Sequence, residues 1–134
     1  MDLKDIVEVY SLKEDGEKQL SKNFKVREFR CKDGSDPVFV APLLVHILQT
    51  IRGIAGASVN INSAYRTPTH NKSVGGVDNS RHMRGKAADI VVTGMTPREV
   101  AELAEKIMPD WGGIGVYSTF THIDLRPIKT KWNG

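Results

Sequence analysis

Apolar residues recur at helical spacing in two segments of the chain. The first segment begins at Pro42, which suits the first turn of a helix, and ends at Gly53 or Gly56. Its apolar positions are Leu43, Leu44, Ile47, Leu48 and Ile51. The second segment begins at the capping box Thr96-Pro97-Arg98-Glu99 and ends before Pro109. Its apolar positions are Val100, Leu103, Ala104 and Ile107. The pattern therefore predicts two amphipathic helices.

Other segments have the pattern of strands. Residues 58–63 alternate apolar and polar side chains, and residues 87–92 are apolar except for Asp89. Residues 113–117 and 121–125 are two further apolar segments separated by a short turn. Because strands joined by so short a turn are antiparallel, the order of elements predicts an α+β fold. In that fold a central antiparallel sheet carries helices packed on one side.

The remaining segments are more polar. Residues 1–21 are rich in charge after a brief apolar patch, and we expect a loosely attached N-terminal extension before a single domain over residues 22–134. We expect an irregular or extended piece over residues 24–29 and a turn at residues 32–35. Residues 64–86 lack clear periodicity beyond one helical turn, which is typical of a functional loop.

Composition narrows the class of protein. Hydrophobic residues make up 40% of the 134 positions and charged residues 26%, which argues against disorder and against a membrane protein. The net charge of +3 is too small to indicate a nucleic-acid partner. The N-terminus lacks the pattern of a secretory signal, so we expect a cytoplasmic location as synthesised. We also expect a monomer.

Three residues with reactive side chains are expected to be structural. The single cysteine, Cys31, excludes an internal disulfide and a cysteine-rich zinc finger, and we expect it in or near the core. His46 lies in an apolar helical pattern and is expected to be a core residue. His70 lies in the polar loop and is expected at the surface or in a loop hydrogen bond.

Asp89 carries the strongest chemical signal, because a carboxylate inside an apolar strand is costly unless it is paired or binds a metal. His82 precedes it by seven positions, and Gly85 between them lets the chain turn back. His122 and Asp124 share one face of the last predicted strand. Two histidines and one carboxylate suit a hydrolytic zinc centre with an open position. A hydrogen-bonded His–Asp pair is the alternative, and spacing alone leaves both open.

Three segments resemble one known family. Ser80-Arg81-His82-Met83-Arg84-Gly85-Lys86-Ala87-Ala88-Asp89 matches the Ser-x-His-x-x-Gly-x-Ala-x-Asp motif of the zinc D-Ala-D-Ala peptidases. Ser63-Ala64-Tyr65-Arg66-Thr67-Pro68 resembles the family's Ser-Gly-Tyr-Arg-Thr-Pro segment. Gly113-Ile114-Gly115-Val116-Tyr117 and Phe120-Thr121-His122-Ile123-Asp124 resemble its segment with the last ligand. That family includes D,D-carboxypeptidases, vancomycin-resistance dipeptidases and phage endolysins, and it shares its fold with the hedgehog signalling domain.

The resemblance, which extends over residues 22–134, implies roles for individual residues. It makes His82, Asp89 and His122 the zinc ligands. It places Arg66 against the substrate carbonyl or carboxylate, where the guanidinium would stabilise the developing oxyanion. It gives Ser80 a bond to a loop or to the ligand backbone.

Some of these roles have alternatives. For Arg66 the alternative is a structural ion pair with Asp78 or Asp124. Several branches of the family carry an acidic general base three positions before the last zinc histidine, and Thr119 occupies that position here. Asp124 can replace the missing base, or it can orient a histidine ligand. The sequence leaves both roles open.

The resemblance therefore implies a zinc metallopeptidase that hydrolyses peptide bonds in the stem peptides of bacterial peptidoglycan. The bond would be of the D-Ala-D-Ala type, a cross-link or an L-Ala-D-Glu bond. A compact chain without a leader suits a phage or prophage lysis enzyme that acts on the cell wall after release. The alternative is a non-catalytic, zinc-stabilised cell-wall-binding module, which the threonine at position 119 motivates.

Overall fold

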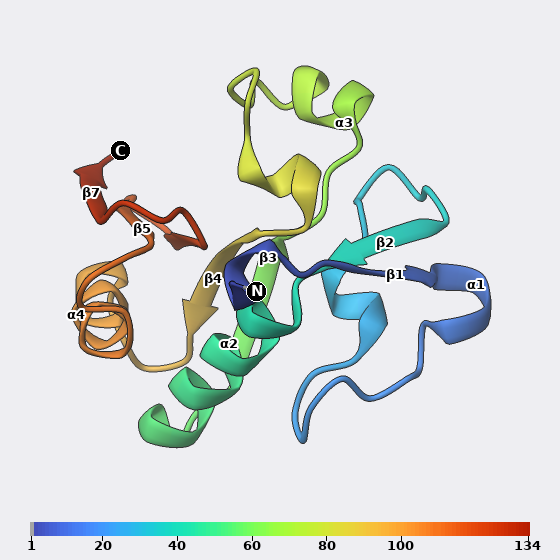
Figure 1. Cartoon of the computed structure of the whole chain (residues 1–134). Helices are drawn as coiled ribbons and strands as arrows, with labels where there is room; N and C mark the ends of the chain where they lie inside the picture. Colours follow the sequence, from blue (N-terminus) through green and yellow to red (C-terminus); the bar gives the residue numbers. More distant parts are fainter. Residues whose placement is uncertain (1) are drawn as a thin grey trace.

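The computed structural model describes residues 2–134 and is built around a five-stranded sheet of strand order β3-β4-β6-β5-β7 (Figure 1). Neighbouring strands are antiparallel except β5 and β7, which run parallel. The strands are β3 (Val59–Ser63), β4 (Ala87–Val92), β5 (Gly113–Val116), β6 (Thr121–Asp124) and β7 (Thr130–Asn133). The predicted α+β class with a mainly antiparallel sheet is confirmed.

Two long helices, α2 (Pro42–Ala55) and α4 (Pro97–Ile107), cover one face of this sheet. They contact each other, and both contact β4. The predicted capping box starts α4, because the Thr96 hydroxyl accepts the Glu99 N–H and the Glu99 carboxylate accepts the Thr96 N–H. The core between sheet and helices includes Leu48, Ile51, Ile90, Val100 and Ile123.

The other face of the sheet carries polar side chains. Asp89 of β4 pairs directly with His122 of β6, and Ala87 pairs with Asp124. Directly paired residues of antiparallel strands lie on the same face, whereas Ile90 and Ile123 alternate toward the helices. The strand alternation therefore projects Asp89, His122 and Asp124 together, away from the helical layer.

The described part of the N-terminal segment is tied to the domain, so the expectation of a loosely attached extension is wrong. β1 (Glu8–Ser11) pairs with β2 (Pro37–Val40) in a separate two-stranded sheet. The short helix α1 (Leu12–Asp15) follows, and the Ser11 hydroxyl bonds the Asp36 carboxylate at 2.9 Å. Attachment here depends on backbone pairing with a distant segment, which a local pattern does not reveal. The boundary at residue 21 stays a prediction.

The segments between the main elements contain short helical turns. They are η1 (Leu3–Asp5), η2 (Val26–Phe29), α3 (Pro68–Ser73) and η3 (Arg81–Arg84). The piece expected to be irregular or extended is thus partly the 3-10 turn η2, whose Val26 and Phe29 are buried. The predicted functional loop over residues 64–86 holds α3 and η3, and η3 contacts both α3 and β4 (Figure 1).

Cys31 and His46 were both expected in or near the core, and only Cys31 is buried. Cys31 is fully buried, as predicted. His46 is exposed, so the prediction for it is wrong, because the buried positions of α2 lie on the other side of the helix. No helix within residues 2–134 is long and apolar enough to cross a membrane.

Candidate active site

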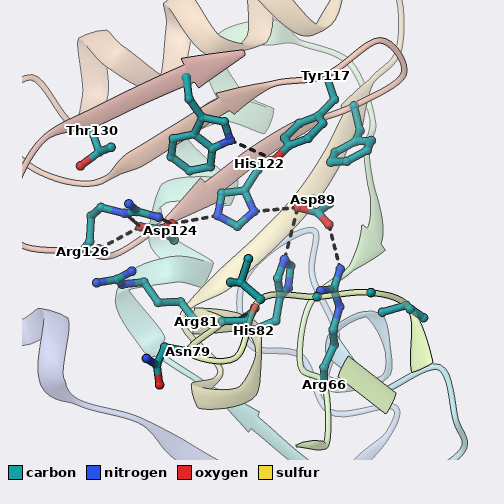
Figure 2. Close-up of a pocket in the computed structure, with 17 residues that line it drawn as sticks. Arg66, Asn79, Arg81, His82, Asp89, Tyr117, His122, Asp124, Arg126 and Thr130 are labelled. Atoms are coloured by element: carbon teal, nitrogen blue, oxygen red, sulfur yellow. Dashed lines mark hydrogen bonds and ion pairs between the residues drawn. The ribbon is translucent and has the colours of Figure 1, made fainter. Parts of the chain in front are cut away.

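Three potential metal ligands meet on the polar face of the sheet. They are His82 of η3, Asp89 of β4 and His122 of β6, and one ligand atom of each lies within 4.8 Å of the others. The Asp89 Oδ1 atom is 3.3 Å from His82 Nε2 and 2.9 Å from His122 Nδ1 (Figure 2). The structure therefore brings together the three residues that sequence spacing left far apart.

Local geometry turns His82 toward the sheet. The Ser80 hydroxyl accepts the His82 N–H at 3.2 Å and caps η3. Gly85 ends η3 with a φ of 72°, and its Cα packs so closely on the Phe39 carbonyl that a Cβ would not fit. The chain bend predicted between His82 and Asp89 is thus made at a position that requires glycine.

The partners of each imidazole indicate how it can bind a cation. The Ala64 carbonyl can only accept, so His82 Nδ1 donates to it across 2.6 Å and Nε2 is the nitrogen that faces Asp89 Oδ1. His122 lies between two carboxylates, with Nε2 2.8 Å from Asp124 Oδ2 and Nδ1 2.9 Å from Asp89 Oδ1. A cation bound here would replace the ring protons that face Asp89 Oδ1, and each of the three side chains would then offer it one lone pair.

The carboxylate of Asp89 is held from its other side by Arg66. Arg66 Nη2 lies 3.3 Å from Asp89 Oδ2. The same guanidinium donates from Nε to Ser63 Oγ at 3.0 Å and from Nη1 to Asn71 Oδ1 at 3.3 Å. Its ion-pair partner is therefore Asp89, and neither Asp78 nor Asp124 takes that place. With three of five N–H donors used, two remain for a ligand.

Asp124 is bound by two neighbours and is completely buried. Arg126 donates to it from Nε at 2.9 Å, from Nη2 at 2.7 Å and from its backbone N–H at 3.1 Å. The His122 imidazole makes the fourth contact. Both carboxylate oxygens are thus occupied, which fixes the ring of His122 in one orientation.

Asp89, Asp124 and His122 shift one another's pKa values. Burial opposes ionisation of Asp89, but hydrogen bonds from His122 and His82 outweigh it and hold its pKa well below the usual range. Burial likewise opposes ionisation of Asp124, yet His122 and Arg126 keep its pKa low. Burial disfavours the cationic form of His122, but Asp124 and Asp89 raise its pKa overall. The two carboxylates therefore supply negative charge at the convergence point.

A cleft of about 520 Å³ opens over this cluster. Its lining includes the arginines Arg66, Arg81 and Arg126, the aromatic residues Tyr117, Phe120 and Trp132, and the acids Asp89 and Asp124. The Tyr117 and Phe120 rings stack at 4.5 Å between centroids. The cleft thus offers positive charge and flat apolar surfaces around the candidate metal ligands.

The sequence-predicted site residues occupy distinct places. Arg66, Ser80 and Asp124 all line the cleft beside the three candidate ligands. Ser80 bonds the backbone of its own turn. Thr119 is exposed in the turn after β5 and is absent from the cleft lining among the described residues. No acidic side chain therefore occupies the position that several family branches use.

Three residues of the site, Asn71, Arg126 and Trp132, are not predicted from the sequence. Arg126 and Trp132 follow the last predicted strand, and Trp132 lies with its ring centroid 5.3 Å from that of His122. Its indole N–H donates to the Tyr117 hydroxyl at 2.9 Å. Asn71 is buried and holds Arg66. The alternation of Thr130 and Trp132 is the one local sign of the last strand, and it is too short to predict that strand.

Comparison with known proteins agrees with this geometry. The sequence profile of the family described as peptidase M15 matches residues 19–124. A curated protein of Haemophilus influenzae, described as a probable peptidoglycan L,D-endopeptidase MepK, is 34% identical over 94 residues. The match covers 65% of this chain and 49% of that protein. The chain therefore spans about half the length of this relative.

Proposed function

The chain belongs to the peptidase M15 family, and from this premise we propose that it is a zinc-dependent peptidase that hydrolyses the stem peptides of bacterial peptidoglycan. The observation that carries the proposal is the convergence of one nitrogen from each of two imidazoles on Asp89 Oδ1, at 2.9 and 3.3 Å. Nitrogen and oxygen donors in this number suit a catalytic zinc site with three protein ligands.

The chain's own residues prepare the site for hydrolysis. When bound, zinc supplies a Lewis acid that polarises a carbonyl and lowers the pKa of water. Arg66 directs its two free N–H donors to the substrate carbonyl oxygen and stabilises the charge that develops there. Asp124 orients His122 through Nε2, and its four hydrogen bonds favour this role over that of a general base.

Two observations support a stem peptide as the substrate. The cleft is lined by three arginines and two aspartates, so it favours a ligand with free carboxylates, which peptidoglycan stems carry. The relative that shares 34% identity is described as acting on peptidoglycan. The scissile bond would be of the D-Ala-D-Ala type, a cross-link or an L-Ala-D-Glu bond. The motif resemblance to endolysins supports action on the wall after release, in phage or prophage lysis.

The test is digestion of purified peptidoglycan by the full chain, with released fragments identified by mass spectrometry. We expect fragments with zinc present and none after chelation. His122→Ala should bind one equivalent of zinc less than the wild type and release no fragments. His46→Ala, which changes an exposed histidine on α2, serves as the matched control and should behave as the wild type. Full activity of His122→Ala or of the chelated protein would refute the proposal.

Two observations favour a second function. Thr119 lacks an ionisable group where several branches of the family carry a base, and Asp124 is fully occupied by hydrogen bonds. These features also suit a non-catalytic, zinc-stabilised module that binds the cell wall. Co-sedimentation of the zinc-loaded chain with peptidoglycan, without any released fragment, would establish the module and exclude the peptidase.

A further inference from the structure

A second group of metal-ligating side chains lies outside the cleft. Cys31, Asp33 and His70 each place one ligand atom within 4.8 Å of the other two. Cys31 and Asp33 belong to the turn between η2 and β2, and His70 belongs to α3. None of the three lines the cleft over Asp89. The turn before β2 and the start of α3 run next to each other at this point (Figure 1).

Thr67 joins the two segments through its hydrogen bonds. Its backbone N–H donates to Cys31 Sγ at 3.4 Å, and its hydroxyl donates to Asp33 Oδ2 at 2.8 Å. A sulfur that accepts an N–H keeps this hydrogen bond when it binds a metal. Thr67 therefore holds Cys31 and Asp33 next to each other before any metal binds.

The sulfur, oxygen and nitrogen atoms of these three side chains are suited to binding a metal cation. The Asp33 carboxylate accepts hydrogen bonds from the Ser35 N–H at 2.9 Å and from the Thr67 hydroxyl at 2.8 Å, which hold it beside Cys31. The His70 imidazole has no hydrogen-bond partner among residues 2–134. Cys31 is fully buried and Asp33 is exposed, so the cluster has an inner sulfur and an outer oxygen open to solvent.

We propose that Cys31, Asp33 and His70 form a second zinc site, separate from the candidate active site and independent of its chemistry. Thiolate and imidazole ligands select zinc over magnesium or calcium. Neighbouring ligands of tetrahedral zinc lie about 3.5 Å apart, so a closure of about 1 Å would bring the three side chains into position, and water would take the fourth place. The exposed Asp33 and the half-buried His70 have room for that movement. The ion replaces the Cys31 thiol proton, which leaves to solvent.

The position of this site gives it a structural role next to catalysis. Thr67 directly follows Arg66, and Asn71, which holds Arg66, directly follows His70. A metal that joins α3 to the turn before β2 would therefore fix both ends of the segment that carries Arg66. We expect the ion to raise the resistance of the chain to unfolding, because it binds the folded arrangement only.

Cobalt(II) distinguishes the two sites by spectroscopy, because Cys31 is the only cysteine in the chain. A thiolate ligand gives a charge-transfer absorption in the near ultraviolet, whereas the nitrogen and oxygen donors of His82, Asp89 and His122 do not. Titration of the metal-free full chain with cobalt(II) should give this absorption in the wild type and in His82→Ala. It should be absent from Cys31→Ser. Zinc analysis should give two equivalents for the wild type, one for each ligand group.

The variant His70→Ala covers the case in which Cys31→Ser fails to fold, since His70 is only half-buried. We expect it to keep the circular dichroism spectrum of the wild type and to lose at least about 10-fold in cobalt affinity at the thiolate site. His46→Ala is the matched control and should retain the band and its affinity. A wild-type chain without the thiolate band would overturn the proposal. So would a band of unchanged affinity in His70→Ala, because the sulfur would then bind metal without the cluster.

Discussion

Arg66 connects the candidate metal site to the substrate side of the cleft through one planar group. Its guanidinium contacts Ser63, Asn71 and Asp89 on three different edges. A lysine in its place keeps the charge but cannot reach three partners and a ligand at once. The local structure therefore requires an arginine at this position.

We predict that Arg66→Ala lowers kcat/KM by roughly 10²–10³ at saturating zinc, because a preorganised oxyanion partner is lost. Arg66→Lys should recover only part of this loss. The zinc affinity of the active site should fall less than the rate, since His82 and His122 remain in place. Arg84→Ala removes an exposed arginine of η3 outside the cleft and serves as the control. Wild-type kinetics of Arg66→Ala would contradict the assigned role.

Asp124 has two candidate roles, orienting His122 or acting as the general base, and one substitution distinguishes them. Asp124→Asn keeps the shape but removes the charge that fixes His122. For an orienting residue, zinc affinity should fall by roughly 10–100-fold and excess zinc should restore the rate. For a general base, the rate should fall by roughly 10²–10⁴ at any zinc concentration. The four hydrogen bonds of Asp124 lead us to expect the first result.

The elements with clear periodicity were predictable from the sequence. The helices α2 and α4 and the strands β3, β4, β5 and β6 lie where apolar spacing placed them. The strands β1, β2 and β7 were missed, although they have four residues each, as β5 and β6 do. β5 and β6 are apolar and joined by a short turn, whereas β1 pairs with β2 and β7 with β5 across longer stretches of chain. The missed strands therefore depend on distant pairing that their own residues do not indicate.

The residues of the site that lie in sequence motifs were predictable, and the residue that depends on distant strand pairing was not. His82, Asp89 and His122 belong to motifs that can be read along the chain, and the strand alternation places His122 and Asp124 on one face. The contact of Trp132 with His122 depends on β7 returning beside β5 after Pro127. No local pattern indicates that β7 returns there, and so the position of Trp132 beside Tyr117 and Phe120 in the cleft could not be predicted.

Gly115 of β5 leaves room for the Trp132 ring, which lines the cleft. A Cβ on Gly115 would lie 2.6 Å from the Trp132 ring, so the indole would have to move away from Tyr117 and His122. We predict that Gly115→Ala lowers stability by about 1–3 kcal/mol and also lowers the catalytic rate. Gly53→Ala in α2 meets open space and should instead stabilise the chain by about 0.5–1 kcal/mol. Urea unfolding and kinetics measure both, and an unaffected Gly115→Ala variant would contradict the packing argument.

At the scale of the whole molecule, the chain has a small net charge of +3, and three of its arginines line the cleft together with two aspartates. Arg66 and Arg126 are each paired with an aspartate, at 3.3 and 2.7 Å. Arg81 has no ion-pair partner within residues 2–134, and Figure 2 shows its side chain on the same side of the cleft as Arg126. Arg81 is therefore the cation that is available to a substrate carboxylate.

We predict that Arg81 selects stem peptides with a free carboxylate over their carboxamide forms. Arg81→Gln should lower kcat/KM for the carboxylate peptide by roughly 10-fold, which corresponds to one charge-assisted hydrogen bond of about 1.5 kcal/mol. The rate on the matched carboxamide peptide should hardly change, because that peptide offers no charge to Arg81. The preference of the wild type should also weaken as salt rises, since the cleft is open to solvent and its charge is screened. Equal loss on both peptides would assign Arg81 to the fold of η3, and equal wild-type rates on both would remove the carboxylate from recognition.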